Sequence, residues 1–448
     1  MKAKKYLIRA GLSPYRSVSY ERLRHRMGDN LGNLVYANSI FRALSVNDED
    51  ELVPTRYRFA FSKQEAARID EEYDAVILPF ADAIRHDFIR EFLSLASLIK
   101  KLHIPVIVLG IGIRAPYEPG RSEDPLLDMA AKTFFGAVLE HSAKIGVRGE
   151  FTGEYLKRLG FKEEKDYTVI GCPSMYTWGE ALEVRDSWKK LLEDPSSARI
   201  SFNMSQGSTA AHIRFIRENA ARFKEAVYLP QRGEELELMY AGVPFALHAA
   251  PGFPTTLADP LYQSGDVRMY GSVSSWFSFL KTRDFSFGTR MHGNIAALLA
   301  GTPALFCPFD ARTRELVTYH SLPHFTPEEL EAEADGHSAA DLLSAVAKKD
   351  FHSFRAGHPR NFAHYVGFLD ENGLAHIYHG ENAETPHDRK AAAAAQLPPL
   401  IPITRADRPE IARRLSRFHE GAFVKKTTLL HEAKETAKKI LKTAGMGK

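Results

Sequence analysis

Short apolar runs alternate with longer amphipathic stretches through the first part of this chain. Runs rich in Val and Ile predict buried strands at residues 6–10, 75–79, 106–109, 144–147 and 167–170. Apolar residues three and four positions apart predict helices at residues 33–44, 87–102, 125–142 and 152–159. Strands that alternate with helices in this way indicate βαβ units and a mostly parallel sheet.

A second series of the same kind follows a polar, turn-forming stretch at residues 188–197. Its predicted strands are residues 199–203, 226–230, 244–247, 267–270, 285–287 and 304–307, with helices at 210–224 and 275–282. We therefore expect an α/β protein with two Rossmann-like, doubly wound domains that face one cleft. The first would span residues 1–190 and the second residues 198–325.

The pattern weakens after this point and predicts a C-terminal helical extension. Residues 326–378 are expected to form a helical segment, including a helix over 361–369 that ends at Asn372-Gly373. Residues 379–410 are rich in Ala, Pro and polar residues, which is typical of a mobile linker. Residues 411–448 are predicted to form a basic helical tail.

Composition and charge narrow the functional classes. At 448 residues and 44% hydrophobic content, the chain can bury a sizeable core. No apolar run approaches the roughly 20 residues of a membrane span, and the N-terminus lacks the features of a signal peptide, so we expect a cytoplasmic protein. Cys172 and Cys307 match no metal-ligand spacing, so no metal site is predicted.

The formal charge of +3 is concentrated at the C-terminus. Residues 425–448 carry seven lysines and two glutamates, a net charge of +5, which leaves about −2 for the rest of the chain. The body is therefore not expected to bind nucleic acid. The tail fits either a solvated helix or a helix that rests on the inner, anionic face of a membrane, and both readings stay open.

The segment GTRMHGNIAALLAGTP, residues 288–303, places two basic side chains at a predicted turn between a strand and a helix. Such a turn lies at the carboxyl edge of a parallel sheet, where ligands bind. Backbone N–H groups at a helix start favour an anion. Arg290 could hold a phosphate or carboxylate with two hydrogen bonds, and His292 could exchange a proton near neutral pH. The segment therefore predicts an anion site with an acid–base group.

A purely structural role for these side chains is the alternative. Arg290 could pair with Asp310, and His292 could satisfy a buried carbonyl. The combination of Arg, His and Gly within one turn favours function.

The segment GTRMHGNIAALLAGTPALFCPFD, residues 288–310, resembles the signature of polysaccharide pyruvyl transferases. The family's turn has the form G-x-R-x-H-G and is followed by an Ala/Leu helix, G-x-P and a strand that ends in Asp. Upstream, residues 29–33 (DNLGN), 104–113 (IPVIVLGIGI) and 144–160 (KIGVRGEFTGEYLKRLG) resemble other family segments in the same order. The resemblance covers roughly residues 5 to 320.

Several turns depart from the family pattern. Residues 78–82 (LPFAD) stand where the family has three glycines, and Gly149 follows Arg148 where the family has Asp. Cys172 replaces the Asp of a G-D-P motif, and Asn203 stands where an Arg often ends a strand. These changes leave the turn around His292 intact. They affect the turns that would decide which acceptor and which donor the protein binds.

The resemblance implies transfer of the pyruvyl unit of phosphoenolpyruvate onto a sugar of an exopolysaccharide or cell-surface glycan, as a ketal, without a cofactor. Arg290 and the amides of Gly293 and Asn294 would bind one side of the donor, and Arg148 the other. His292 would be the general acid, acting on the methylene carbon or on the departing phosphate. The acceptor would be a sugar or a lipid-linked oligosaccharide.

Other residues at predicted cleft turns are candidates for substrate binding, and each could equally serve as a cap or turn residue. They are Asn30, Asn33, Asn203, Gln206, Gln231, Thr289 and Asp310.

Two other functions compete with this interpretation. A nucleotide-sugar glycosyltransferase would share the GT-B-like arrangement of two facing domains. It would need a glutamate to hold the ribose, for which Glu315 is the candidate. A non-catalytic carbohydrate-binding homologue would account for the altered turns.

Overall fold

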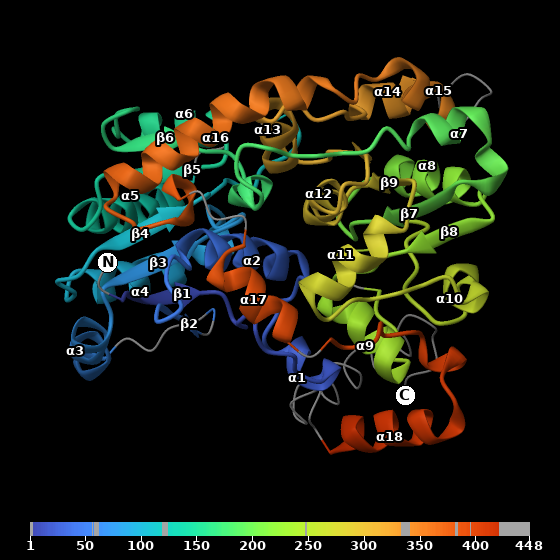
Figure 1. Ribbon diagram of the computed structural model, residues 1–448, viewed down its shortest axis with the longest axis horizontal. Helices are drawn as coiled ribbons and strands as arrows, with labels where there is room; N and C mark the ends of the chain where they lie inside the picture. The colour runs from blue at the N-terminus through green and yellow to red at the C-terminus, as the bar shows by residue number, and fades with distance from the viewer. Residues whose placement is uncertain are drawn as a thin grey trace, which may run out of the picture.

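The computed structural model describes residues 3–55, 57, 62–118, 124–246, 249–332, 341–380, 384–394 and 396–420. Two parallel sheets, each covered by helices, make up the body of the protein (Figure 1). The predicted α/β class, with two Rossmann-like halves that face one cleft and a C-terminal set of helices, is confirmed.

The N-terminal sheet has the strand order β2-β1-β3-β4 and is parallel throughout. A parallel bridge between Ile111 and Val147 continues it into the two-stranded sheet β5-β6. The strands are β1 (Lys5–Arg9), β2 (Glu51–Thr55), β3 (Ala75–Pro79), β4 (Val106–Leu109), β5 (Ile145–Val147) and β6 (Tyr167–Val169). The helices are α1 (Tyr20–Arg24), α2 (Gly32–Leu44), α3 (Lys63–Glu72), η1 (His86–Phe88), α4 (Ile89–Ile99), α5 (Pro125–Leu139), α6 (Glu150–Arg158) and η2 (Pro173–Tyr176).

Alternate side chains of the central strands enter two separate cores. Ile8 and Ile77 belong to the core that contains α2, whereas Leu7 and Val76 belong to the core that contains α4 and α5. This is the consequence of the two-residue repeat of a strand covered on both faces. It explains why these strands read as continuous apolar runs in the sequence.

The C-terminal sheet has the order β10-β9-β7-β8 and is also parallel. Its strands are β7 (Arg199–Asn203), β8 (Glu225–Tyr228), β9 (Phe285–Gly288) and β10 (Ala304–Phe306). Its helices are α7 (Lys189–Glu193), η3 (Pro195–Ser197), α8 (Ala210–Ala220), α9 (Gly233–Ala241), α10 (Pro260–Ser264), α11 (Val273–Lys281), α12 (Met291–Leu299) and α13 (Ala311–Tyr319). Helices α2 and α12 contact each other between the two sheets (Figure 1).

Two predicted strands are wrong, and one strand was missed. Residues 244–246 form no strand, and residues 267–270 make only single bridges, from Val267 to Tyr228 and from Met269 to Leu400. The missed strand is β2, a partly exposed edge strand of sequence ELVPT. Pro54 and flanking polar residues hide its pattern, because an edge strand tolerates both.

The C-terminal helices pack on both halves of the protein. They are α14 (Pro327–Ala332), α15 (Leu342–Lys348), α16 (Ser353–Glu371), η4 (Ile377–His379), α17 (Pro386–Ala393), η5 (Ile403–Arg405) and α18 (Arg408–His419). Helix α16 runs along one side of both halves (Figure 1). Phe351, just before it, stacks on Trp188, and Asn372 at its end accepts hydrogen bonds from the amides of Ala143 and Lys144.

The stretch 379–410, predicted as a mobile linker, instead packs on the body in its described part. Arg42 of α2 makes two hydrogen bonds to Asp388 of α17, of 2.9 and 3.0 Å. Leu400 is buried and exchanges backbone hydrogen bonds with Met269, and the Tyr20 hydroxyl donates to the Pro398 carbonyl. The composition was misleading because these contacts come from elements far away in the sequence. Residues 421–448, which include the charged tail, lie outside the described residues.

Candidate functional site

A cleft of about 1330 Å³ opens between the two halves and is lined by residues of both. Eight arginines line it: Arg9, Arg85, Arg90, Arg114, Arg148, Arg232, Arg290 and Arg312. Six acidic residues line it as well: Asp29, Asp82, Asp87, Glu91, Glu234 and Asp310. The lining therefore carries a net charge of about +2 when His292 is neutral, which favours an anionic ligand.

The predicted turn around Arg290 lies at the carboxyl end of β9 and at the wall of this cleft. Gly288 has φ +142°, and a side chain there would meet the carbonyl oxygen of Asn203, so only glycine fits. Arg290 is the N-cap of α12, which begins at Met291 rather than at Asn294. His292 therefore lies in the first turn of the helix. The prediction that it belongs to the turn between the strand and the helix is wrong.

This earlier helix start changes which amides face an anion. The Asn294 amide, predicted as a donor to the ligand, donates to the Arg290 carbonyl at 3.1 Å. The amides without an intrahelical acceptor are those of the first turn, Met291 to Gly293. The positive end of the α12 dipole lies at the same place.

Two buried asparagines hold the turn. The Asn203 Oδ1 atom accepts the Arg290 amide at 2.7 Å, and its Nδ2 atom donates to Asn294 Oδ1 at 2.8 Å. Asn294 Nδ2 in turn donates to the Gly288 carbonyl at 2.9 Å. Asn203, Asn294 and Gly293 lie behind the cleft surface and do not line it. Asn203 and Asn294 thus support Arg290, and the ligand-binding role predicted for them and for the Gly293 amide stays a prediction.

Arg290 is almost fully buried and is held from behind. Its Nε atom donates to the Met204 carbonyl at 2.8 Å, and its Nη2 atom lies 3.6 Å from Glu235 Oε2. Burial lowers the pKa of this guanidinium, and Glu235 opposes that effect. Arg290 Nη2 and Gln231 Nε2 are both buried donors without an acceptor among the described residues. Both residues line this wall of the cleft, but these two atoms are themselves enclosed by protein.

His292 lies beside Tyr36, with ring centroids 5.9 Å apart, and its Nε2 atom is 3.6 Å from Cys172 Sγ. Burial lowers the pKa of His292 well below 6.5, and the charges of Arg148 and Arg312 add to this. The imidazole is therefore neutral at neutral pH in the unliganded protein. The expectation that its proton moves near pH 7 thus applies only to a state in which an anion offsets these charges.

Arg148 reaches the same place from the N-terminal half. It follows β5, and its guanidinium lies 5.2 Å from the centre of the Tyr36 ring. Its Nε atom donates to the Gly110 carbonyl at 2.6 Å, and Nη2 donates to the Phe80 carbonyl at 3.2 Å. Arg148 and His292 thus contact the same tyrosine, as expected for two residues that approach one ligand from opposite halves.

The remaining predicted residues all lie at the cleft, and some of them also serve as turn or cap residues. Asn30, Asn33, Gln206, Gln231, Thr289 and Asp310 all line the cleft. Asn30 and Asn33 also serve as turn residues, because Asn30 Oδ1 accepts the Gly32 amide and Asn33 Nδ2 donates to the carbonyls of Met27 and Gly28. Asp310 caps α13 and pairs with Arg312, not with Arg290.

A cluster around Asp82 was missed by the sequence reasoning. Arg85, Arg114 and Arg312 all pair with its carboxylate. Burial acts to raise the pKa of Asp82, but the three guanidiniums together hold it well below its usual range. No local motif in the sequence predicts this cluster, because its members come from three separate segments and from both halves.

Glu315 does not line the cleft. Both of its oxygens accept hydrogen bonds from Thr152, from the amide at 3.0 Å and from the hydroxyl at 2.9 and 3.0 Å. Burial raises its pKa to about 7. It joins α13 of the C-terminal half to α6 of the N-terminal half.

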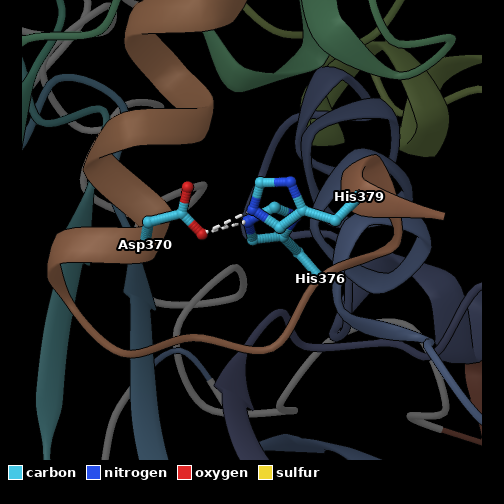
Figure 2. A group of neighbouring side chains, drawn as sticks. All are labelled: Asp370, His376 and His379. Atoms are coloured by element: carbon cyan, nitrogen blue, oxygen red, sulfur yellow. Dashed lines mark hydrogen bonds and ion pairs between the residues drawn. The ribbon is translucent and has the colours of Figure 1, made fainter.

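One group of potential metal ligands occurs among the described residues, far from the cleft: Asp370, His376 and His379 (Figure 2). Asp370 Oδ1 lies 3.0 Å from His376 Nε2 and 2.8 Å from His379 Nε2. His376 Nδ1 accepts the Tyr378 amide at 3.2 Å, so the proton of the neutral ring resides on Nε2 and points to the carboxylate. Hydrogen bonding accounts for the group, and we assign no metal to it.

No helix among the described residues is both long and apolar enough to span a membrane.

The fold defines an α/β protein with an arginine-lined cleft between two Rossmann-like halves. The family model of polysaccharide pyruvyl transferases matches residues 30–310. This chain therefore belongs to the polysaccharide pyruvyl transferase family, and it is a transferase by that membership.

Similar solved structures share little sequence with this chain. An uncharacterized protein from Klebsiella pneumoniae is 14% identical, with 72% of this chain and 93% of that chain covered and a TM-score of 0.35. UDP-GlcNAc 2-epimerase from Methanocaldococcus jannaschii, in complex with UDP-GlcNAc and UDP, is 11% identical, with 83% and 99% covered and a TM-score of 0.40. HepE from Anabaena, in complex with UDP, is 10% identical, with 93% and 98% covered and a TM-score of 0.38.

The comparison with curated proteins gives no match. At these identities and TM-scores, the solved structures carry no information on the activity of this chain.

Proposed function

We propose that this protein transfers the pyruvyl unit of phosphoenolpyruvate onto two hydroxyls of a sugar in an exopolysaccharide or cell-surface glycan. The product is a cyclic ketal, and phosphate is released. The observation that carries the proposal is the approach of Arg290, His292 and Arg148 to one cleft from both halves. Family membership supports the same reaction class.

The donor carries a phosphate and a carboxylate on one small carbon frame. Arg290, which lines the cleft, and the first-turn amides of α12 would bind one anionic group. Arg148, which donates to the backbone carbonyls of Gly110 and Phe80, would bind the other. The two groups thus have separate cationic partners on opposite walls.

His292 acts as the general acid. Its pKa is low in the unliganded protein because it is buried near Arg148 and Arg312. A bound phosphate offsets these positive charges and raises the pKa of the imidazole, so donor binding itself prepares the proton. Protonation of the methylene carbon leaves a cationic centre, which the first sugar hydroxyl attacks.

The bond changes balance without a redox step. One C–O bond forms between the donor carbon and each of two sugar oxygens, and the bond from that carbon to the phosphate oxygen breaks. Of the two hydroxyl protons, one ends on the new methyl group and the other on phosphate. No cofactor is needed.

We further propose that the acceptor is a sugar or lipid-linked oligosaccharide and that the two sheets belong to separate domains, residues 1–190 and 198–325. We also propose that the basic residues 425–448 attract the protein to an anionic membrane surface, where such acceptors are assembled.

Ligand-induced thermal stabilisation of the full chain tests the donor. Phosphoenolpyruvate should raise the melting temperature by mass action, whereas UDP, GDP and CMP should not. Stabilisation by a nucleotide alone would favour a glycosyltransferase. Stabilisation by none of these ligands would favour a non-catalytic homologue. A positive result is followed by phosphate release and detection of the ketal in the presence of glycan acceptors.

One observation speaks against the glycosyltransferase alternative. Glu315, the residue that would hold a nucleotide ribose, is bound on both oxygens by Thr152 and lies outside the cleft lining.

A further inference from the structure

Arg9 occupies a distinct position in the cleft. It ends β1, at the carboxyl edge of the N-terminal sheet, where ligands of parallel α/β proteins bind. Its Nε atom donates to the Tyr57 carbonyl at 3.1 Å. Three aromatic rings surround the guanidinium, with centroids at 4.7 Å (Phe80), 5.1 Å (Tyr57) and 5.8 Å (Phe88).

The charge of Arg9 has no carboxylate partner in the described part of the chain. Of the eight cleft arginines, five form ion pairs there: Arg85, Arg114, Arg232, Arg290 and Arg312. Arg90, which also has none, is exposed to solvent, whereas Arg9 is partly buried. Burial lowers the pKa of Arg9 to about 10, and Tyr57 and then Glu91 oppose this only in part.

A partly buried cation without a carboxylate partner is costly unless a ligand neutralises it. The aromatic faces recover some of this free energy through cation–π attraction. The guanidinium still offers its fork of N–H donors toward the cleft, which suits a phosphate or a carboxylate. Arg9 therefore has the features of a ligand-binding arginine.

Arg9 and Arg148 lie on two sides of Phe80. Arg148 donates to the backbone oxygen of Phe80, whereas Arg9 packs over its ring. Arg148, together with Arg290 and His292, is already assigned to the donor. The cleft thus contains a second cationic position that the donor does not need.

We propose that Arg9 binds an anionic group, a phosphate or a carboxylate, of the sugar acceptor, in a subsite separate from that of the donor. The inference rests on the proposed function, because it names the chemical class of the acceptor. The rings of Tyr57 and Phe88 line the cleft next to this cation and offer an apolar wall to the sugar itself.

Binding measurements on the full chain test this without any need for turnover. The probes are N-acetylglucosamine 1-phosphate, glucuronate, neutral N-acetylglucosamine and phosphoenolpyruvate, each titrated by calorimetry. We expect at least one charged sugar to bind tenfold or more tightly than the neutral one. The phosphate and carboxylate probes identify which anion is preferred.

Arg9→Met should weaken the charged sugar at least tenfold and leave phosphoenolpyruvate within twofold of wild type. Arg290→Lys should weaken phosphoenolpyruvate at least tenfold and leave the charged sugar within twofold of wild type. Arg114→Gln is the matched control, because it removes a cleft arginine that is paired with Asp82, and it should change neither affinity. The melting temperature of Arg9→Met should be unchanged or higher, because an uncompensated buried charge is removed.

Three results would overturn the proposal. The first is equal loss of charged sugar and phosphoenolpyruvate in Arg9→Met, which would mean one shared site. The second is binding of charged and neutral sugars with equal affinity by wild type. The third is unfolding of Arg9→Met together with wild-type affinity in Arg9→Lys. Binding of a charged sugar through Arg9 without binding of phosphoenolpyruvate would support this subsite and refute the proposed donor.

Discussion

The two walls of the cleft carry similar charges but are built differently. On the wall of the C-terminal half, the β9–α12 turn and the start of α12 contribute Arg290 and His292, and Asn203 and Asn294 hold the backbone of this turn. The wall of the N-terminal half is assembled from several turns, and its arginines are either paired around Asp82 or left with aromatic and backbone partners.

The difference lies in what prepares each wall for a ligand: the positioning of groups on the C-terminal wall, and the pairing of charges on the N-terminal wall. On the C-terminal wall, buried amide hydrogen bonds fix the ligand-facing groups before any ligand arrives, which reduces the cost of ordering them. On the N-terminal wall, the Asp82 carboxylate neutralises part of the positive charge. Only the arginines that do not pair with Asp82 therefore remain for ligands. Four predictions test this contrast.

The largest effect is expected for His292→Ala. Loss of a general acid should lower turnover by about 10²–10⁴-fold, while donor affinity should change little, because the imidazole is neutral before the donor binds. Steady-state rates and donor titration measure the two quantities. Cys172→Ala removes the neighbouring thiol and serves as the control for local repacking. Wild-type turnover in His292→Ala would exclude the assignment.

Arg290→Lys compared with Arg114→Lys contrasts the two walls directly. Lysine keeps the charge but loses the planar fork and the Nε bond to Met204. Donor affinity should fall about tenfold or more in Arg290→Lys, equivalent to roughly 1.4 kcal/mol. Donor affinity should stay at the wild-type value in Arg114→Lys, because the partner of Arg114 is Asp82. Equal losses in both variants would mean that the donor senses only net charge.

Glu315→Gln tests the joint between the walls. Burial raises the pKa of Glu315 to about 7 from the ordinary value of 4.5, so the folded chain holds a proton that the unfolded chain releases. The free energy of unfolding contributed by this group is therefore present below about pH 4.5 and is lost as pH rises through 7. Urea unfolding at several pH values should show a shallower loss in the variant, by roughly 3 kcal/mol.

The control for this pH series is Glu118→Gln, which removes an exposed carboxylate that pairs with Arg314 in the same region. Its unfolding should follow the pH dependence of wild type. An identical pH dependence in wild type and Glu315→Gln would refute the assignment to Glu315.

The smallest effect is expected from adding one methyl group behind the C-terminal wall. A side chain at Gly293 would lie 2.4 Å from Gln231 Nε2 and 3.0 Å from Asn203 Nδ2. Gly293→Ala should therefore cost roughly 1 kcal/mol of stability and weaken donor binding. Gly136→Ala, in open space on α5, should instead stabilise by roughly 0.5–1 kcal/mol. Thermal and donor titrations of both variants provide the comparison, and equal behaviour would mean that the turn is not tightly packed.

Local sequence was enough for features whose determinants are close together along the chain. The strands of the two sheets were predicted because each is buried on both faces and reads as an apolar run. The β9–α12 turn was predicted because glycine, arginine and histidine lie within six residues of each other. The edge strand β2 and the packed stretch 379–410 were not, because their stability comes from distant partners.

By itself, the sequence determined the α/β class and most of the strands, and it predicts an anion site at Arg290 and His292. Only the tertiary structure decided that Asn203 and Asn294 support this site rather than line it. It also decided that Arg148 meets His292 across Tyr36, and that Arg9 lacks a carboxylate partner in the described part of the chain. The physical reason is that burial and charge pairing depend on neighbours in space, which can lie far apart in the chain: 48 residues separate Arg9 from Tyr57, and 87 separate Asn203 from Arg290.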